Sequence, residues 1–185
     1  MNLNIKRNCV LLWNFIDPIY YHFTRLNYIQ NDDGKKTIIR VRLTRYKGRK
    51  ITLSDGTVIN KNDILLKIHL HNVKLMREMD GKNSDIRRAL IIYKSVRESL
   101  PYVARYIQSH GYTSEIKGLI GITTLHKGCR KLNFEVFSIY NPYYKMFKRI
   151  ALLPIHLLST ENKWKEIPSP MYLFMSKKRL FKEYN

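Results

Sequence analysis

Two histidines stand two residues apart at the end of a segment that alternates polar and apolar residues. In a strand, the side chains of His69 and His71 project to the same face, where two imidazoles could bind one metal ion. Such a site needs one or two further ligands. The candidates are His126, Cys129, Asp55 and Asp63. Two other roles stay open for the pair: structural hydrogen bonds to backbone or a carboxylate, and anion binding or proton transfer.

A second polar group stands where a predicted strand passes into a predicted helix. The strand covers 118–123 and the helix 125–131, so hydroxyls, basic side chains and helix N-terminal N–H groups converge there, which suits a phosphate or carboxylate. The residues concerned are Thr123, Thr124, His126 and Lys127. An ordinary threonine helix cap is the alternative, and the Gly-x4-Gly-Lys-Ser/Thr spacing of a phosphate-binding loop is absent.

The two groups meet if strand 63–71 lies parallel to strand 118–123. Both strands then end at the same edge of the sheet, where ligands bind in open α/β folds. One crevice would hold His69, His71, Asn72, Thr123, Thr124 and His126. Histidines near helix N-termini and basic neighbours resist protonation, so we expect neutral imidazoles. An enzyme that uses His69, His71 and His126 is therefore one hypothesis, although the sequence has no complete catalytic motif and implies no cofactor.

A basic strand gives the strongest indication of a partner. Residues 34–54 hold eight lysines and arginines and no Asp or Glu. Basic and apolar residues alternate over 37–46, which predicts arginines on one strand face and apolar residues on the other. If strand 63–71 is its neighbour, the expected basic face consists of Arg40, Arg42, Lys67, His69 and His71. The expected core face consists of Ile39, Val41, Leu43, Ile64, Leu66 and Ile68.

The charge of the whole chain agrees with an anionic partner. The formal net charge is +20, from 34 Lys and Arg against 14 Asp and Glu. Such a charge favours nucleic acid, an acidic membrane surface or an anionic polymer. Tyrosines interleaved with basic residues could stack on bases, but no RNA-recognition motif, zinc finger or helix-turn-helix pattern is present. Two cysteines without a CxxC pair favour a reducing compartment, so we expect a cytoplasmic protein or one attached to the inner face of the membrane.

The pattern of helices and strands along the sequence predicts one domain over residues 1–185, which must position these residues. Helical spacing covers 8–27, and Ser84 begins a long helix that Pro101 breaks or restarts. Its predicted buried stripe is Ile86, Ala89, Leu90, Tyr93, Val96 and Leu100. Strands are expected at 37–46, 49–53, 57–60, 63–71, 118–123, 133–139 and 171–175, and helices at 73–80, 125–131, 143–149 and the C-terminus. The fold class is α/β or α+β, with one mixed sheet in which N-terminal hairpins precede a β-α-β unit.

Residues 143–158 carry cations that lead into a long apolar stretch. This pattern fits an interfacial membrane element or, alternatively, a buried part of the core. No segment has the roughly 20 apolar residues that a transmembrane helix needs.

In order and spacing, the motifs resemble the YkoP-like family of small bacterial domains. The resemblance runs almost end to end, through residues 17–21, 24–26, 40–48, 53–63, 68–72 and 116–137. Such domains occur alone or fused behind polysaccharide deacetylases, which implies an accessory role near cell-envelope polysaccharide metabolism. The resemblance implies no catalytic residues. The leading hypothesis is a non-catalytic module that binds an anionic envelope polymer, a precursor or a membrane surface; nucleic-acid binding and a histidine-based enzyme are the alternatives.

Overall fold

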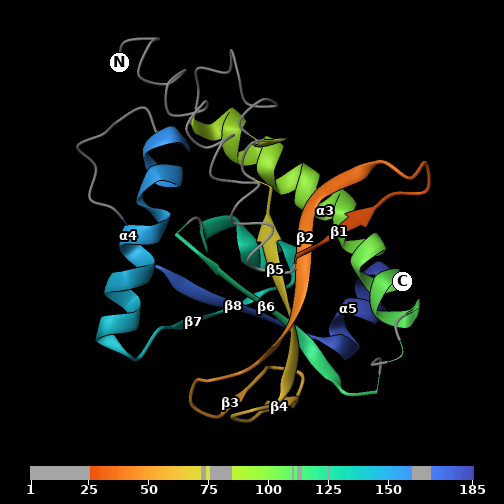
Figure 1. Cartoon of the computed structure of the whole chain (residues 1–185), viewed down its shortest axis with the longest axis horizontal. Helices are drawn as coiled ribbons and strands as arrows, with labels where there is room; N and C mark the ends of the chain where they lie inside the picture. The colour runs from red at the N-terminus through yellow and green to blue at the C-terminus, as the bar shows by residue number, and fades with distance from the viewer. Residues whose placement is uncertain are drawn as a thin grey trace.

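A six-stranded mixed sheet organises the protein, as seen in a computed structural model (Figure 1). The structure describes residues 26–71, 74–75, 85–109, 111, 114–124, 126–159 and 168–185. The strands, in spatial order, are β1 (Asn27–Gln30), β2 (Lys36–Arg45), β5 (Ile64–Leu70), β6 (Ile116–Thr123), β8 (Met171–Ser176) and β7 (Glu135–Ser138). A separate hairpin pairs β3 (Ile51–Thr52) with β4 (Val58–Ile59).

The one parallel pair of the sheet is β5 with β6. Helix α3 (Asp85–Ser109) connects these two strands, which gives a β-α-β unit in addition to the one predicted over 118–139. The predicted unit of strand, helix and strand over 118–139 is also present, as β6, the 3-10 helix η1 (His126–Leu132) and β7. In that unit β8 lies between the two strands and runs antiparallel to both.

The register of β2 and β5 confirms the predicted division of faces. Arg40 stands opposite His69, and Arg42 opposite Lys67. Since partners in a ladder project to the same side, these four residues share one face. Ile39, Val41 and Leu66 lie on the other face and are fully buried. Leu43 was expected in this core but is 43% exposed, near the end of β2.

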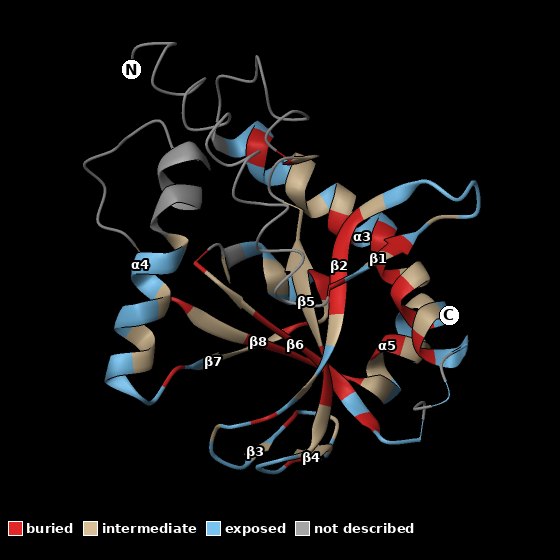
Figure 2. Cartoon of the chain, in the orientation of Figure 1, coloured by how far each residue is buried: buried red, intermediate tan, exposed pale blue. Residues whose placement is uncertain are grey.

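The main core lies on the face covered by α3 and α5 (Lys177–Tyr184) (Figures 1 and 2). The buried residues of α3 are Val96, Leu100, Val103, Ala104 and Ile107. The predicted stripe was wrong at its start, because Ile86 and Leu90 are 74% and 60% exposed, and Ala89 is exposed as well. The buried apolar residues of α3 therefore begin at Val96, well after the predicted start of the stripe.

Two further boundaries differ from the sequence prediction. Pro101 neither breaks nor restarts α3, which continues through it. Residues 143–158 form a single helix, α4 (Pro142–Ser159). The helix-like spacing predicted for 8–27 lies almost entirely in residues 1–25, which are outside the described part; its last residue, Asn27, begins strand β1. Most of the predicted helix 73–80 is also outside the described part.

Among the described helices, none combines the length and apolar character needed to cross a membrane.

A second, smaller core lies on the opposite face of the sheet, beneath the β3–β4 hairpin. It consists of Tyr46, Leu53, Ile59, Leu65, Ile120 and Phe174. Leu65 shares a face with Lys67 and was expected to accompany the polar residues, but the hairpin covers it completely. The basic face is therefore divided between an apolar half under the hairpin and a polar half farther along β5.

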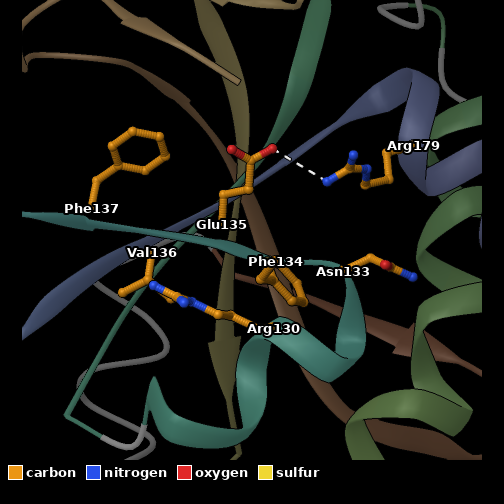
Figure 3. Close-up of a pocket in the computed structure, with 7 residues that line it drawn as sticks. All are labelled: Arg130, Asn133, Phe134, Glu135, Val136, Phe137 and Arg179. Carbon is orange, nitrogen blue, oxygen red and sulfur yellow. Dashed lines mark hydrogen bonds and ion pairs between the residues drawn. The ribbon is translucent and has the colours of Figure 1, made fainter. Parts of the chain in front are cut away.

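Polar contacts fasten the hairpin to the sheet. The carboxylate of Glu135 accepts hydrogen bonds from the Ser54 backbone N–H (2.9 Å) and hydroxyl (2.8 Å), and from Arg179 (3.3 Å; Figure 3). Asp55 accepts from the Thr57 N–H (3.0 Å) and from the hydroxyl of Ser176, the residue that caps α5. The hairpin is thus tied to both β7 and the start of α5.

The Asp55 carboxylate stabilises this attachment only while it is ionised. Burial raises its pKa, but the hydrogen bonds from Ser176 and Thr57 and the charge of Arg179 outweigh burial and hold the pKa below the usual 3.8. A carboxyl group whose pKa is lower in the folded state contributes stability above its unfolded pKa, and this contribution is lost as the pH falls through the folded value.

We expect Asp55→Asn to lower the free energy of unfolding by about 1 kcal/mol at pH 7, and the difference from wild type to shrink as the pH falls below 3.8. Urea unfolding at a series of pH values measures both effects. Asp33→Asn is the matched control, because Asp33 pairs only with exposed partners at the surface. Equal pH profiles for the two variants would contradict the assignment.

Candidate functional site

A long groove opens between the β2–β3 loop, the sheet and the segment that leads from β7 into α4. Its volume is about 1410 Å³. The loop residues 46–50 form one wall, residues 138–142 and Tyr144 the other, and Lys67, Ile120, Ile122 and Tyr172 the floor. This basic groove is much larger than the other cavity, of about 310 Å³, beside Glu135 and Arg179 (Figure 3).

The charges along the groove have one sign. Its cationic residues are Arg45, Lys47, Arg49, Lys50, Lys61 and Lys67. Among the described residues, no Asp or Glu lines it. Lysines and arginines along a cleft without acidic residues create a positive potential that attracts anions.

Backbone contacts hold the basic wall in place. The Tyr46 N–H donates to the Asp63 carbonyl (2.9 Å), and the Asn62 N–H donates to the Tyr46 carbonyl (2.7 Å). Asn62 has a φ of 73°, which its short polar side chain tolerates better than most residues do. Gly48 leaves room for the Tyr46 ring, because a Cβ there would lie 2.3 Å from the Tyr46 hydroxyl. The loop can therefore fold back over the ring and present its cations on the outside.

Aromatic rings line the groove between the cations, but most pack on one another. They are Tyr46, Phe137, Tyr140, Tyr144 and Tyr172. Tyr172 stacks on Tyr144 at 6.4 Å and meets Tyr46 edge-on at 6.3 Å. Burial, together with the neighbouring tyrosines, raises the pKa of Tyr172, so this phenol stays neutral. The guanidinium of Arg49 covers the Tyr140 ring at 4.4 Å.

Two further cations lie near Lys67, the groove residue on β5. This cation cluster consists of Arg42 on β2, Lys67 on β5 and Lys148 on α4, and His69 on β5 lies beside it. Burial, followed by the charges of Lys148 and Arg42, lowers the pKa of Lys67 to about 8. Burial and Arg42 also lower the pKa of Lys148. These cations repel one another, so an anion bound among them would relieve the repulsion.

His69 is neutral at physiological pH, as expected. Burial is the main reason, and the charges of Lys67, Arg42, Lys148 and Arg40 add to it; together they lower the pKa of His69 to about 3. The sequence argument had the correct direction and correctly named basic neighbours, but it also relied on helix N-termini and did not include burial, which contributes most.

Arg40 does not belong to the accessible surface. It is only 2% exposed, and its guanidinium lies over the Tyr28 ring, 4.7 Å from the ring centre. The predicted row of arginines available to a partner is therefore wrong at this position. The reason is that β1 pairs along β2 and places Tyr28 directly opposite Arg40.

The two strand ends of the proposed crevice do lie side by side, because β5 and β6 are parallel neighbours. His71 packs edge-on against Tyr28, at 5.6 Å between ring centres. Thr123 ends β6, Thr124 is buried, and His126 begins η1. A site that these residues share with His69 and His71 stays a prediction. Asn72 and the side chain of Lys127 lie outside the described residues.

The candidates for a metal site serve other roles. Within the described ranges, no three His, Cys, Asp or Glu side chains are grouped closely enough to hold a metal ion. Asp55 binds Ser176, and Asp63 accepts a hydrogen bond from the Asn60 N–H (2.8 Å). Burial raises the pKa of Cys129 to about 11, which disfavours the thiolate that metals bind.

Sequence reasoning missed the second half of the basic run as part of the site. Residues 45–50 were assigned to strand ends and a turn, yet they supply four of the six groove cations. The absence of acidic residues from 34–54 was the available signal. The contribution of Tyr140, Tyr144 and Tyr172 had no local signal, because these tyrosines reach the groove only through tertiary packing.

Comparison with known proteins gives one family. The profile of the YkoP domain matches residues 6–184. A Bacillus subtilis (strain 168) protein described as "Uncharacterized protein YkoP" is 47% identical over 180 residues, which cover 96% of this chain and 97% of that protein. No solved structure matches the chain significantly.

We expect Lys67 to titrate near pH 8, and Arg42→Gln to raise its pKa because the cation directly opposite is removed. NMR of ¹³C-methylated lysines measures this titration. Arg97→Gln removes the same charge from α3, on the other side of the sheet, and should leave the pKa of Lys67 unchanged. A pKa of 10.5 for Lys67 in the wild type would show that the cluster does not form.

Proposed function

Since this chain belongs to the YkoP domain family, we propose that it is a non-catalytic module that binds an anionic polymer of the cell envelope, or the precursor of one, in the basic groove. The observation that carries the proposal is the groove itself, which has six cations and no acidic residue in its described lining. The proposed site of action is the cytoplasmic side of the membrane, where envelope precursors are assembled.

The size of the groove favours an extended ligand. Small-molecule sites usually occupy about 300–1,000 Å³. The groove exceeds that range, at about 1410 Å³, and six cations line it. A chain of repeating phosphates or carboxylates could contact several of them at once, whereas a small anion could contact only a few.

The chemistry of the groove favours binding over catalysis. Its described lining contains no His, Asp, Glu or Cys, the side chains that most often move protons or attack substrates. The pKa of Tyr172 is raised, so it is a poor base at neutral pH. Lys67 is the titratable group nearest to neutrality, and it has no acidic or imidazole partner in the described lining.

Nucleic acid is the second candidate, favoured by the aromatic residues in the groove. Single strands bind where bases can stack on open ring faces. Here Tyr46 is buried, Tyr144 and Tyr172 stack on each other, and Arg49 covers Tyr140. Among the groove rings only Tyr140 is largely exposed, and Arg49 covers one of its faces, whereas five of the six groove cations are exposed. A phosphate-rich polymer without bases therefore suits the groove better.

We expect Lys50→Glu/Lys61→Glu to weaken binding of poly(glycerol phosphate) by at least about tenfold and to reduce the slope of log K against log salt by about 2, because two phosphate contacts are lost. Fluorescence anisotropy with a labelled polymer at several salt concentrations measures both quantities. Both lysines are exposed and line the groove, so folding should be preserved.

Lys178→Glu/Lys182→Glu is the matched control. It lowers the net charge equally but alters exposed residues of α5, away from the groove. It should retain most of the affinity. An equal loss in both variants would mean that binding depends on net charge alone. Tighter binding of a single-stranded deoxythymidine oligomer than of the polymer would favour the nucleic-acid alternative, and no binding of either at low salt would refute the proposed function.

A further inference from the structure

Helix α4 exposes an apolar stripe to solvent. Its residues and their exposed fractions are Tyr143 (80%), Met146 (60%), Phe147 (61%) and Ile150 (62%). They follow the spacing i, i+3, i+4 and i+7, which places them on one face of a helix. Tyr140, just before the helix, is 72% exposed but lines the basic groove, so it is not counted in this outer stripe. Figure 2 shows the described half of α4 largely exposed.

The helix is oriented opposite to the usual arrangement. A surface helix of a soluble protein normally turns its apolar face to the core and its charges to water. In α4 the inward residues are instead Tyr144, which stacks on Tyr172, and Lys148, which belongs to the cation cluster. Large apolar side chains concentrated on the outer face indicate a surface that another apolar phase covers.

The local structure fixes this orientation firmly. Pro142 occupies the first turn of α4, where proline is favoured, and the Asn141 side chain caps the helix by accepting from the Tyr144 N–H (2.9 Å). The Tyr144–Tyr172 stack then sets the rotation of the helix about its axis. The outer stripe is therefore presented to solvent by a defined start and a packed inner face.

The charges near the stripe indicate what covers it. The net charge is +20, Arg49 lies against Tyr140, and exposed Arg149 lies beside Ile150 in the sequence. The basic groove opens on the inner side of the same helix. A second copy of the chain would bring two strongly cationic surfaces together, whereas an anionic bilayer offers negative headgroups above an apolar interior.

We propose that the outer stripe of α4 docks the protein on an anionic lipid bilayer, with the apolar side chains entering the headgroup boundary and the flanking cations at the lipid phosphates. Tyr143 suits such a boundary because one end of its ring is apolar and the other is polar. Docking through this face leaves the groove on the other side of α4 open to a polymer. This inference goes beyond the proposed function, because it concerns a different surface.

The test is co-sedimentation of the full chain with vesicles. Wild type should bind phosphatidylcholine vesicles that contain phosphatidylglycerol and bind pure phosphatidylcholine far less. Met146→Ser/Ile150→Ser should reduce partitioning by at least about tenfold, because two apolar side chains no longer enter the bilayer. The matched control is Ile86→Ser/Leu90→Ser, which removes equally exposed apolar side chains from α3 and should bind as wild type does.

Two further measurements distinguish lipid docking from polymer binding in the groove and from dimer formation. Met146→Ser/Ile150→Ser should bind poly(glycerol phosphate) as wild type does, so a failure of lipid docking and a failure of the groove are told apart. Unchanged vesicle binding by this variant, or an equal loss in the α3 control, overturns the proposal. So does sedimentation equilibrium showing a wild-type dimer that the variant dissociates, because the stripe would then bind a second copy.

Discussion

The register between β2 and β5 is the constraint on which the rest of the structure depends. It places Arg42 directly opposite Lys67, although like charges across a ladder are destabilising. A slip by one residue would separate them, but it would also turn Ile39 and Val41 away from the core that α3 covers. Burial of those side chains outweighs the repulsion, so the main core on one face determines the positive potential on the other.

The repulsion that results is a property that a binding protein can use. Lys67 and Lys148 are held in an environment where their charged forms are disfavoured. An anionic ligand would stabilise the charged forms of these lysines. Its binding free energy would therefore include relief of the repulsion between the cations, in addition to its direct contacts. The hairpin covers the apolar half of this face of the sheet, and α4 adds one more cation, Lys148, near Lys67.

The sequence predicted features that depend on local periodicity. Alternation along 37–46 and 63–71 was sufficient to assign both strand faces, whereas only the first half of α4, at 143–149, was predicted as a helix. It could not predict features that depend on distant contacts. The groove requires the hairpin, which is held to β7 by a contact between Ser54 and Glu135, 81 residues apart in the sequence. The burial of Arg40 requires β1, a strand at 27–30 that was not predicted. The outward orientation of the apolar face of α4 depends on Tyr172, a partner that no local pattern identifies.

The position of β8 in the sheet has a consequence for biosynthesis. This strand, at residues 171–176, lies between β6 and β7, which leave the ribosome more than thirty residues earlier. Neither neighbour can complete its hydrogen bonds until β8 emerges, and Ser176 must also be present to hold Asp55. The basic groove, which Tyr172 of β8 helps to line, therefore stays incomplete until residues 171–176 have been synthesised. A chain of this charge, made beside ribosomal RNA, completes the groove only after β8 has left the exit tunnel.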